Sequence, residues 1–533
     1  MMKKRLWSRW ILALAVVWPF MAAARDRVRE KENFDFDWKF ILNADDRANA
    51  GMQVSEAGWQ DVQLPHDWSI SQNFDPKLSG SNGHLPGGIG WYRKTFRVDK
   101  KDKGRRIAVL FDGIYSRSDV YVNGQHLGFR PYGFCYQEHD LTPYLNYGAE
   151  NVLAVRVNNP LEHDSVARWY TGAGIYRHAW LVKTAEVHVA SYGTYVTTPV
   201  VTAERAEVRV RTSVANEAER TKTLSVRQQI TDGEGCTVVQ SGKQTLQVAA
   251  GQTADTEHTL EIPRPQLWET EHPYLYTLHT AVYDGRKLVD TYETVFGVRT
   301  CEFTSDRGFL LNGKPLKLKG FCLHQDDASL GTALPLRSME RKLEICKEYG
   351  VNAIRCSHNQ PSPEFLDLCD RMGFVVIDEA FDKWKSGYYA QYFDAWWQED
   401  LKNMLVRDRN HPCIVLWSLG NEAGGWKNQD ACCEYLHHVC PEIPVHYEGV
   451  IRTRRLAYDV ISEMYPHIDH VREVGERREK KKLGEKPFFM CEYAHAMGVG
   501  PGGLAEYWDA VLSSDRLMGG CIWEWADHAV LNP

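Results

Sequence analysis

The chain has 533 residues, too many for one hydrophobic core, so we expect two to four domains. Hydrophobic residues make up 43% and charged residues 25%, which is typical of a soluble globular protein. The net charge is −7 and both signs are spread along the chain, so no basic stripe favours a nucleic-acid partner. The 18 tryptophans fit two alternatives, namely stacking against sugar rings and packing in large β-rich cores.

The N-terminus has the three parts of a secretory signal. Lys3-Lys-Arg5 is basic, residues 10–20 are apolar, and Ala22-Ala-Ala24 supplies small residues for cleavage. The apolar stretch is too short for a comfortable membrane span, and no cysteine follows Ala24 to carry a lipid. We therefore expect a signal peptide over 1–24 and an exported protein, periplasmic or secreted, without a membrane anchor.

The thirteen cysteines are an odd number, so at least one thiol is unpaired. Most lie in apolar runs, where cysteine behaves as a small buried hydrophobe. Cys432-Cys433 and Cys440 lie near His437-His438, which suggests a metal site. The spacing fits no zinc pattern well, so we favour a helix face and predict no metal there.

The first half of the chain is rich in predicted β-structure. Short alternating segments at 107–111, 119–122 and 152–157 are separated by turn signals such as Asn123-Gly124. They predict a jelly-roll β-sandwich over residues 25–185. The Thr/Val-rich alternation that follows predicts a smaller Ig-like sandwich over 186–298.

Near Cys301, strand-like runs begin to alternate with helical stretches, the clearest at 338–349, 363–371 and 395–409. Eight β-then-α units predict a (β/α)₈ TIM barrel over residues 299–533. Because the sequence stops just past the eighth strand, we expect a barrel that is truncated at its C-terminal end. The predicted strands are 316–324, 353–358, 374–379, 414–419, 445–448, 460–465, 488–492 and 520–525.

Two carboxylates close apolar strand runs. Glu422 ends the run Ile-Val-Leu-Trp-Ser-Leu-Gly-Asn-Glu, and Glu492 ends Phe-Phe-Met-Cys-Glu. Catalytic groups of a TIM barrel collect at the C-terminal ends of its strands, and a pair of carboxyl groups in one cleft suits glycoside hydrolysis. A helix-capping role is the alternative for Glu422. Some other barrel carboxylates are expected to be structural and paired with Arg355; the candidates are Asp378, Glu379, Glu448, Glu463 and Glu524.

These motifs resemble glycoside hydrolase family 2, most closely its large bacterial β-galactosidases, over about residues 34–533. The resemblance implies the domain order jelly roll, Ig-like sandwich and TIM barrel, together with exo-acting, retaining hydrolysis of a carbohydrate substrate. The segments that carry it are Trp91-Tyr-Arg-Lys-Thr-Phe96, Asp119-Val-Tyr-Val-Asn-Gly124, Gly174-Ile-Tyr-Arg177, Asn410-His-Pro412, Trp417-Ser-Leu-Gly-Asn-Glu422 and Cys491-Glu-Tyr-Ala-His-Ala-Met-Gly498.

By the same resemblance, Glu422 is the general acid/base and Glu492 is the nucleophile that forms a glycosyl-enzyme ester. Asn421, beside the acid, is placed to bind a sugar hydroxyl. Further residues match family positions that hold the sugar or the nucleophile, although for each histidine an ordinary core or surface role is the alternative. The hydroxyl ligands are His324, His358 and His495, the tyrosine that bonds the nucleophile is Tyr465, and the aromatic platform is Trp523.

The chain also departs from the family pattern. Magnesium-dependent galactosidases carry Glu-Thr-His-Gly after the third strand, whereas residues 378–384 here read Asp-Glu-Ala-Phe-Asp-Lys-Trp. We therefore predict no catalytic magnesium and no other cofactor. The Asn-x-Lys element by which β-glucuronidases recognise a uronate has no clear counterpart.

We therefore favour a β-galactosidase. The alternatives are β-glucuronidase, β-mannosidase and a non-catalytic carbohydrate-binding remnant, and the sequence leaves open whether the chain is a monomer or a homo-oligomer.

Overall fold

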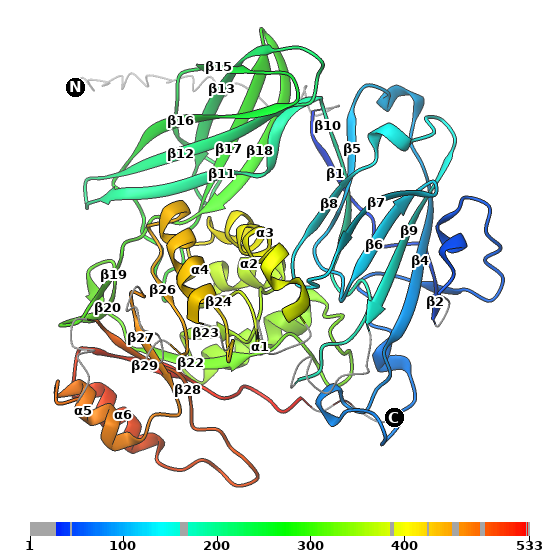
Figure 1. The fold of residues 1–533 in the computed structure, drawn as a ribbon. Coiled ribbons are helices and arrows are strands. Elements are labelled where there is room, and N and C mark those ends of the chain that lie inside the picture. The colour runs from blue at the N-terminus through cyan, green and yellow to red at the C-terminus, as the bar shows by residue number, and fades with distance from the viewer. Residues whose placement is uncertain are drawn as a thin grey trace, which may run out of the picture.

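A computed structural model describes most of the chain, and the predicted signal peptide lies outside the part that it describes. No helix in that part is long and apolar enough to cross a membrane. Figure 1 shows two β-rich bodies, one blue to cyan and one green, next to a mixed helix and strand domain that ends in orange and red. The described residues are 28–42, 45–159, 169–383, 389–423, 426–449, 458–479, 486–528 and 530.

The first body is a sandwich of two antiparallel sheets, as the alternating pattern predicts. The sheets have the strand orders β1-β10-β5-β8 and β3-β2-β4-β9-β6-β7. Large aromatic side chains such as Trp38, Trp68 and Tyr92 fill the core between them. The strands are β1 (Glu30–Asn33), β2 (Trp38–Leu42), β3 (Gln60–Val62), β4 (Gly88–Arg97), β5 (Arg106–Phe111), β6 (Ser118–Val122), β7 (Gln125–Arg130), β8 (Gln137–Asp140), β9 (Glu150–Asn159) and β10 (Ala179–Thr184), and the 3-10 turns are Arg47–Ala50, Ser69–Ser71, Gly80–Asn82, Lys100–Asp102 and Thr142–Tyr144.

The second body is a smaller antiparallel sandwich, which agrees with the predicted Ig-like domain. One sheet has the order β11-β12-β16, and the other has β14-β13-β17-β18 with β15 paired to β13. Buried and exposed residues alternate along β12 and β16, so each strand turns one face to the core and one to solvent. The strands are β11 (Val187–Val201), β12 (Arg205–Asn216), β13 (Lys222–Thr231), β14 (Thr237–Gln240), β15 (Gln244–Val248), β16 (Gln252–Pro263), β17 (Tyr276–Asp284) and β18 (Lys287–Phe296).

The third body is the predicted barrel, reached through a small antiparallel sheet of β19 (Cys301–Thr304), β20 (Gly308–Leu311) and β21 (Lys314–Pro315). Eight parallel strands follow in the order β26-β25-β24-β23-β22-β29-β28-β27, and each overlaps a strand predicted from the sequence. Within the described residues no pairing joins β26 to β27. The strands are β22 (Leu318–Leu323), β23 (Ala353–Cys356), β24 (Val375–Glu379), β25 (Ile414–Ser418), β26 (Val445–His446), β27 (Ile461–Met464), β28 (Phe488–Tyr493) and β29 (Leu517–Ile522).

Among the described residues a helix lies between each pair of successive barrel strands except β26 and β27, and these helices pack their apolar residues against the sheet. The helices predicted at 338–349, 363–371 and 395–409 are confirmed as α1, α2 and α3. At the end of α2, Gly373 has φ +72°, and an added Cβ would lie 2.2 Å from the Thr270 carbonyl oxygen, so glycine is required there. The helices are α1 (Leu336–Glu348), α2 (Pro363–Met372), α3 (Ala390–Asp408), α4 (Trp426–Val439), α5 (Ile468–Gly475) and α6 (Leu504–Leu512).

The first sandwich is fastened to the barrel by buried polar contacts. The Asp67 carboxylate accepts hydrogen bonds from the Tyr170 hydroxyl (2.7 Å) and from the backbone N–H of Thr332 in the loop after β22 (3.0 Å). Arg177 donates from Nη2 to the carbonyl oxygen of Gln360 after β23 (2.7 Å). These buried hydrogen bonds fix how the first domain docks, so this domain takes part in shaping the barrel mouth.

Candidate active site

Glu492, near the end of β28, has both carboxylate oxygens held by other side chains. Arg355 donates from Nη1 to Oε1 at 2.6 Å, and the Tyr465 hydroxyl donates to Oε2 at 2.7 Å. Nε2 of His358 lies 3.8 Å from Oε1. Burial and the charge of Glu492 raise the pKa of Tyr465, so its phenol stays protonated and remains a donor. The carboxylate of Glu492 is thus oriented before any substrate arrives.

Arg355 connects this carboxylate to three other strand ends. It lies on β23, is fully buried, and makes a two-pronged ion pair with Glu379 on β24, from Nε to Oε2 (2.9 Å) and from Nη2 to Oε1 (3.0 Å). Its Nη2 also donates to Oδ1 of Asn421 at 3.2 Å. The expected pairing of a barrel carboxylate with Arg355 is confirmed for Glu379. Because guanidinium presents several donors in one plane, a single side chain positions both Glu492 and Asn421.

Glu422 follows β25 and is partly exposed. Its φ of +40° is uncommon for a residue with a side chain, and its backbone N–H donates to Oε1 of Glu448 at 2.9 Å. The preceding Asn421 donates from Nδ2 to Asp382 at 3.3 Å, and burial raises the pKa of Asp382 to about 7. The loop is therefore held on both sides of Glu422, and Arg355 joins it to the support of Glu492.

Aromatic rings surround these carboxylates. The rings of His358 and Trp523 stack with centroids 5.0 Å apart and planes 9° from parallel. His324 lies edge-on to Trp523 at 5.4 Å, and the exposed His495 lies 6.3 Å from Trp523. Trp169, from the first domain, contacts His324 at 4.9 Å and His358 at 5.5 Å. Flat apolar faces beside polar groups are the surfaces on which sugar rings pack.

Two histidines of this aromatic group, His358 and His324, are buried, and burial affects their protonation. Burial and the nearby Arg355 charge lower the pKa of His358 well below its ordinary value, so its imidazole is neutral. Its Nδ1 lies 2.6 Å from Oε1 of Glu379, and in the Nδ1–H tautomer it donates a hydrogen bond to that oxygen. Burial also lowers the pKa of His324, whose Nε2 has no hydrogen-bond partner among the described residues.

All eight residues that the sequence nominated lie in this one region. Glu422 and Asn421 come from the loop after β25, Glu492 from β28, and the others from neighbouring loops and strand ends. Sequence analysis missed the contribution of Trp169 and treated Arg355 only as a structural partner. It also missed Glu448 as a hydrogen-bond acceptor for Glu422. An arginine inside an apolar strand was the one signal that could have identified Arg355 as central, because an unpaired buried charge is too costly to persist.

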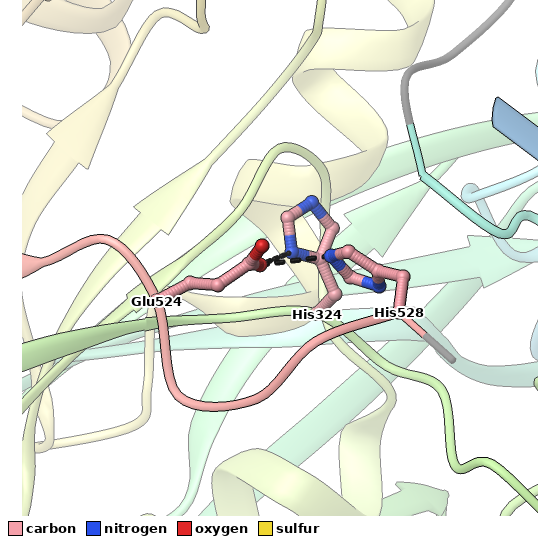
Figure 2. A group of neighbouring side chains, drawn as sticks. All are labelled: His324, Glu524 and His528. Carbon is pink, nitrogen blue, oxygen red and sulfur yellow. Dashed lines mark hydrogen bonds and ion pairs between the residues drawn. The ribbon is translucent and has the colours of Figure 1, made fainter. Parts of the chain in front are cut away.

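One group of side chains next to this region has the composition of a metal site. His324, Glu524 and His528 each offer a ligand atom within 4.8 Å of the others. Figure 2 shows the Glu524 carboxylate facing two neighbouring imidazole rings, with a dashed line to each of them. In the described segment 378–383, Glu379 forms its ion pair with Arg355.

The arrangement offers two carboxyl groups in different surroundings. Glu492 is an oriented carboxylate that can attack a carbon, and Glu422 is a second carboxyl group that can carry a proton. Arg355 contacts Glu492 and also Asn421, the residue before Glu422, so one side chain links the two strand ends.

Comparison with known proteins matches the chain to three family models along its length. They are described as the sugar binding domain of glycosyl hydrolases family 2 at residues 34–185, glycosyl hydrolases family 2 at 187–299, and the TIM barrel domain of the same family at 304–532.

Individual relatives agree with these matches. A β-galactosidase of Bacteroides ovatus is 45% identical over 406 residues, which cover 74% of this chain and 46% of the relative. A β-glucuronidase of Formosa agariphila is 31% identical over 87% of this chain and 48% of its own length. The chain thus spans about half the length of these curated relatives.

Solved structures have the same fold. A glycosyl hydrolase family 2 member from Bacteroides cellulosilyticus superposes with a TM-score of 0.84 at 35% identity, covering 93% of this chain and 67% of that one. A β-glycosidase from Bacteroides vulgatus superposes with a TM-score of 0.83 at 28% identity, covering 93% and 70%.

Proposed function

Since the chain belongs to glycoside hydrolase family 2, we propose that it hydrolyses terminal β-glycosides with retention of configuration, and that its sugar is β-D-galactose. The observation that carries the proposal is the Glu492 carboxylate, held by Arg355 and Tyr465 beside the loop of Asn421 and Glu422. A carboxylate fixed at both oxygens is suited to attack rather than to pack a core.

The reaction proceeds in two displacements. Glu492 attacks the anomeric carbon while Glu422 protonates the glycosidic oxygen, so that the aglycone leaves as an alcohol and a glycosyl ester forms on Glu492. Glu422, now a carboxylate, removes a proton from water. The resulting hydroxide displaces Glu492 from the sugar, and both carboxyl groups return to their starting states. Asn421 and the three histidines bind sugar hydroxyls, and Trp523 packs against the sugar ring.

Galactose is proposed because β-galactosidases account for six of eight curated relatives, including the one at 45% identity. A β-glucuronidase is the second candidate, supported by the Formosa agariphila relative.

The test is a panel of nitrophenyl β-glycosides (galactoside, glucuronide, mannoside and glucoside), hydrolysed by the purified chain. Galactoside cleavage at a kcat/KM at least tenfold above the other sugars is expected. Preferential cleavage of the glucuronide would replace the first candidate by the second, and no cleavage by a cooperatively folded chain would leave a non-catalytic carbohydrate-binding protein.

The nucleophile is tested by substitution and by trapping. Glu492→Gln is expected to abolish turnover, because an amide is not a nucleophile at the anomeric carbon. Glu463→Gln is the matched control, since this carboxylate on the neighbouring β27 pairs with His470 at 3.2 Å, and activity should persist. A 2-fluoro-galactoside with a good leaving group should form a stable ester, and peptide mass spectrometry should locate it on Glu492. An ester on another carboxylate would disprove the assignment.

We also propose that the protein is exported, on the basis of the basic, apolar and small-residue segments between Lys3 and Ala24. N-terminal sequencing of the protein recovered from a bacterial periplasm should begin at Arg25. A chain found only in the cytoplasm with Met1 intact would contradict export.

A further inference from the structure

The group formed by His324, Glu524 and His528 is built like a metal centre. His324 follows β22, and the other two residues follow β29, so two adjacent strand ends bring them together. Nδ1 of His324 lies 3.0 Å from Oε2 of Glu524, and Nε2 of His528 lies 2.8 Å from the same oxygen (Figure 2). Two imidazole nitrogens and one carboxylate oxygen are the donor set of many catalytic zinc sites.

A fourth residue supports the second imidazole. Nδ1 of His528 lies 2.8 Å from Oδ2 of Asp326, on the side of the ring away from Glu524. In metal sites the ring nitrogen that does not bind the ion is commonly hydrogen-bonded to a carboxylate, which fixes the ring and its tautomer. Asp326 has this position with respect to His528.

The group lines a cavity with a volume of about 210 Å³, so an ion has space and a path of entry. Four carboxylates border this cavity, and Lys342 is the one lysine among its lining residues. The ammonium group of Lys342 donates to the backbone oxygen of Asp326. The local charge is therefore negative and favours a cation. The carboxylates are Asp326, Asp327, Glu524 and Asp527.

We propose that His324, Glu524 and His528 bind one divalent transition-metal ion, with Zn²⁺ the appropriate probe, and that Asp326 orients His528 from outside the coordination shell. Imidazole ligands favour zinc and its neighbours in the transition series over Mg²⁺, which prefers oxygen. Tetrahedral zinc with bonds of about 2.0–2.1 Å separates its ligand atoms by roughly 3.3 Å. The present separations of 2.8 and 3.0 Å need to open by only a few tenths of an ångström.

The ion would compete with a proton. Imidazole binds a metal only in its neutral form, so binding is best measured at mildly alkaline pH. With Nδ1 of His324 bound to metal, its proton resides on Nε2, which then serves as a donor.

The experiment is calorimetric titration of chelator-treated protein with ZnCl₂ at pH 8. Cys236 is an exposed thiol that could bind zinc, so every protein tested carries Cys236→Ser. One zinc per chain is expected, together with visible d–d absorption when Co²⁺ is added instead. His528→Gln should weaken zinc binding at least 100-fold, and Asp326→Asn should weaken it about 10- to 100-fold.

Asp527→Asn is the matched control, because it removes one charge from the same cavity without removing a ligand atom. Its affinity should stay within about threefold of the parent, as expected for an exposed charge. If His528→Gln does not fold, judged by its thermal transition, Glu524→Gln replaces it. Absence of zinc binding, equal affinity of the ligand variants and the parent, or equal loss in Asp527→Asn and His528→Gln would each overturn the proposal.

The readouts are binding and absorption, not hydrolysis. A failure of the metal site therefore leaves the glycosidase proposal untouched, and an inactive chain can still bind zinc. The inference goes beyond the proposed function because none of the catalytic steps assigned to Glu422 and Glu492 requires the ion.

Discussion

Replacing Arg355 with lysine is expected to keep the buried positive charge but to lose several of the hydrogen bonds that hold Glu379, Glu492 and Asn421 in place. The guanidinium donates five hydrogen bonds to oxygen: two to Glu379 and one each to Glu492, Asn421 and the backbone of Cys491. A lysine ammonium has three donors, so at least two of these bonds disappear. Bonds to charged groups contribute about 1.5–3 kcal/mol each, so the free energy of unfolding should fall by about 3 kcal/mol or more.

The catalytic loss should be larger than the stability loss suggests. An ammonium cannot hold both Glu492 and Asn421 in the present geometry, and misplacement by about 1 Å can cost 100-fold in rate. We therefore expect Arg355→Lys to lower kcat/KM for nitrophenyl β-galactoside about 100-fold, measured at a temperature where the variant is fully folded. Thermal unfolding monitored by circular dichroism establishes that temperature.

Arg516→Lys is the matched control. Arg516 is also fully buried, pairs with Glu479 at 2.7 Å, and lies just before β29, at the opposite end of the strand from the proposed site. Its substitution should lower stability to a similar extent and leave the kcat/KM of the folded protein unchanged. The reasoning is refuted if Arg355→Lys keeps kcat/KM within threefold of the parent, or if both variants lose activity equally.

Three other outcomes are expected. Glu422→Ala should lose most activity on poor leaving groups and recover it on an activated galactoside with azide, giving a β-galactosyl azide; no azide product would count against the acid/base role. Trp523→Ala removes the indole ring that packs against the sugar, a contact worth about 1–2 kcal/mol, so KM should rise about tenfold and kcat should change less. An unchanged KM would show that Trp523 does not contact the sugar. Burial alone would lower the pKa of His411, but its carboxylate partner Asp370 raises that pKa to about 9. Because this is above the pKa in the unfolded chain, the ion pair stabilises the fold fully below pH ~6.5, and this stabilisation is lost as the pH rises through 9. The Tm difference between the parent and His411→Gln should therefore shrink from pH 6 to pH 9.5, and a constant difference would contradict the ion pair.

The sequence was sufficient to predict the architecture because hydrophobic periodicity is a local property. Alternation with a period of two marked the strands of both sandwiches, and eight apolar runs between helical stretches marked the barrel strands. The same logic placed Glu422 and Glu492 at strand ends, since each of them ends a short apolar run. The described structure confirms the three-body fold and brings both residues to one region.

What the sequence could not determine was which distant side chains share a site. Trp169 reaches His324 and His358 only because Asp67 and Arg177 fix the first sandwich on the barrel mouth. No local pattern encodes such a contact between segments about 150 residues apart.

The metal-like group has the same origin. His324 and Glu524 stand 200 residues apart, and parallel pairing of β22 with β29 makes them neighbours. Sequence spacing draws attention to Cys432 and His437 as zinc ligands, because it indicates only residues that are close along the chain. Strand ends are defined by local hydrophobicity, which the sequence contains, whereas the neighbours of a strand end are decided by strand order, domain docking and the pairing of buried charge, which exist only in the folded chain.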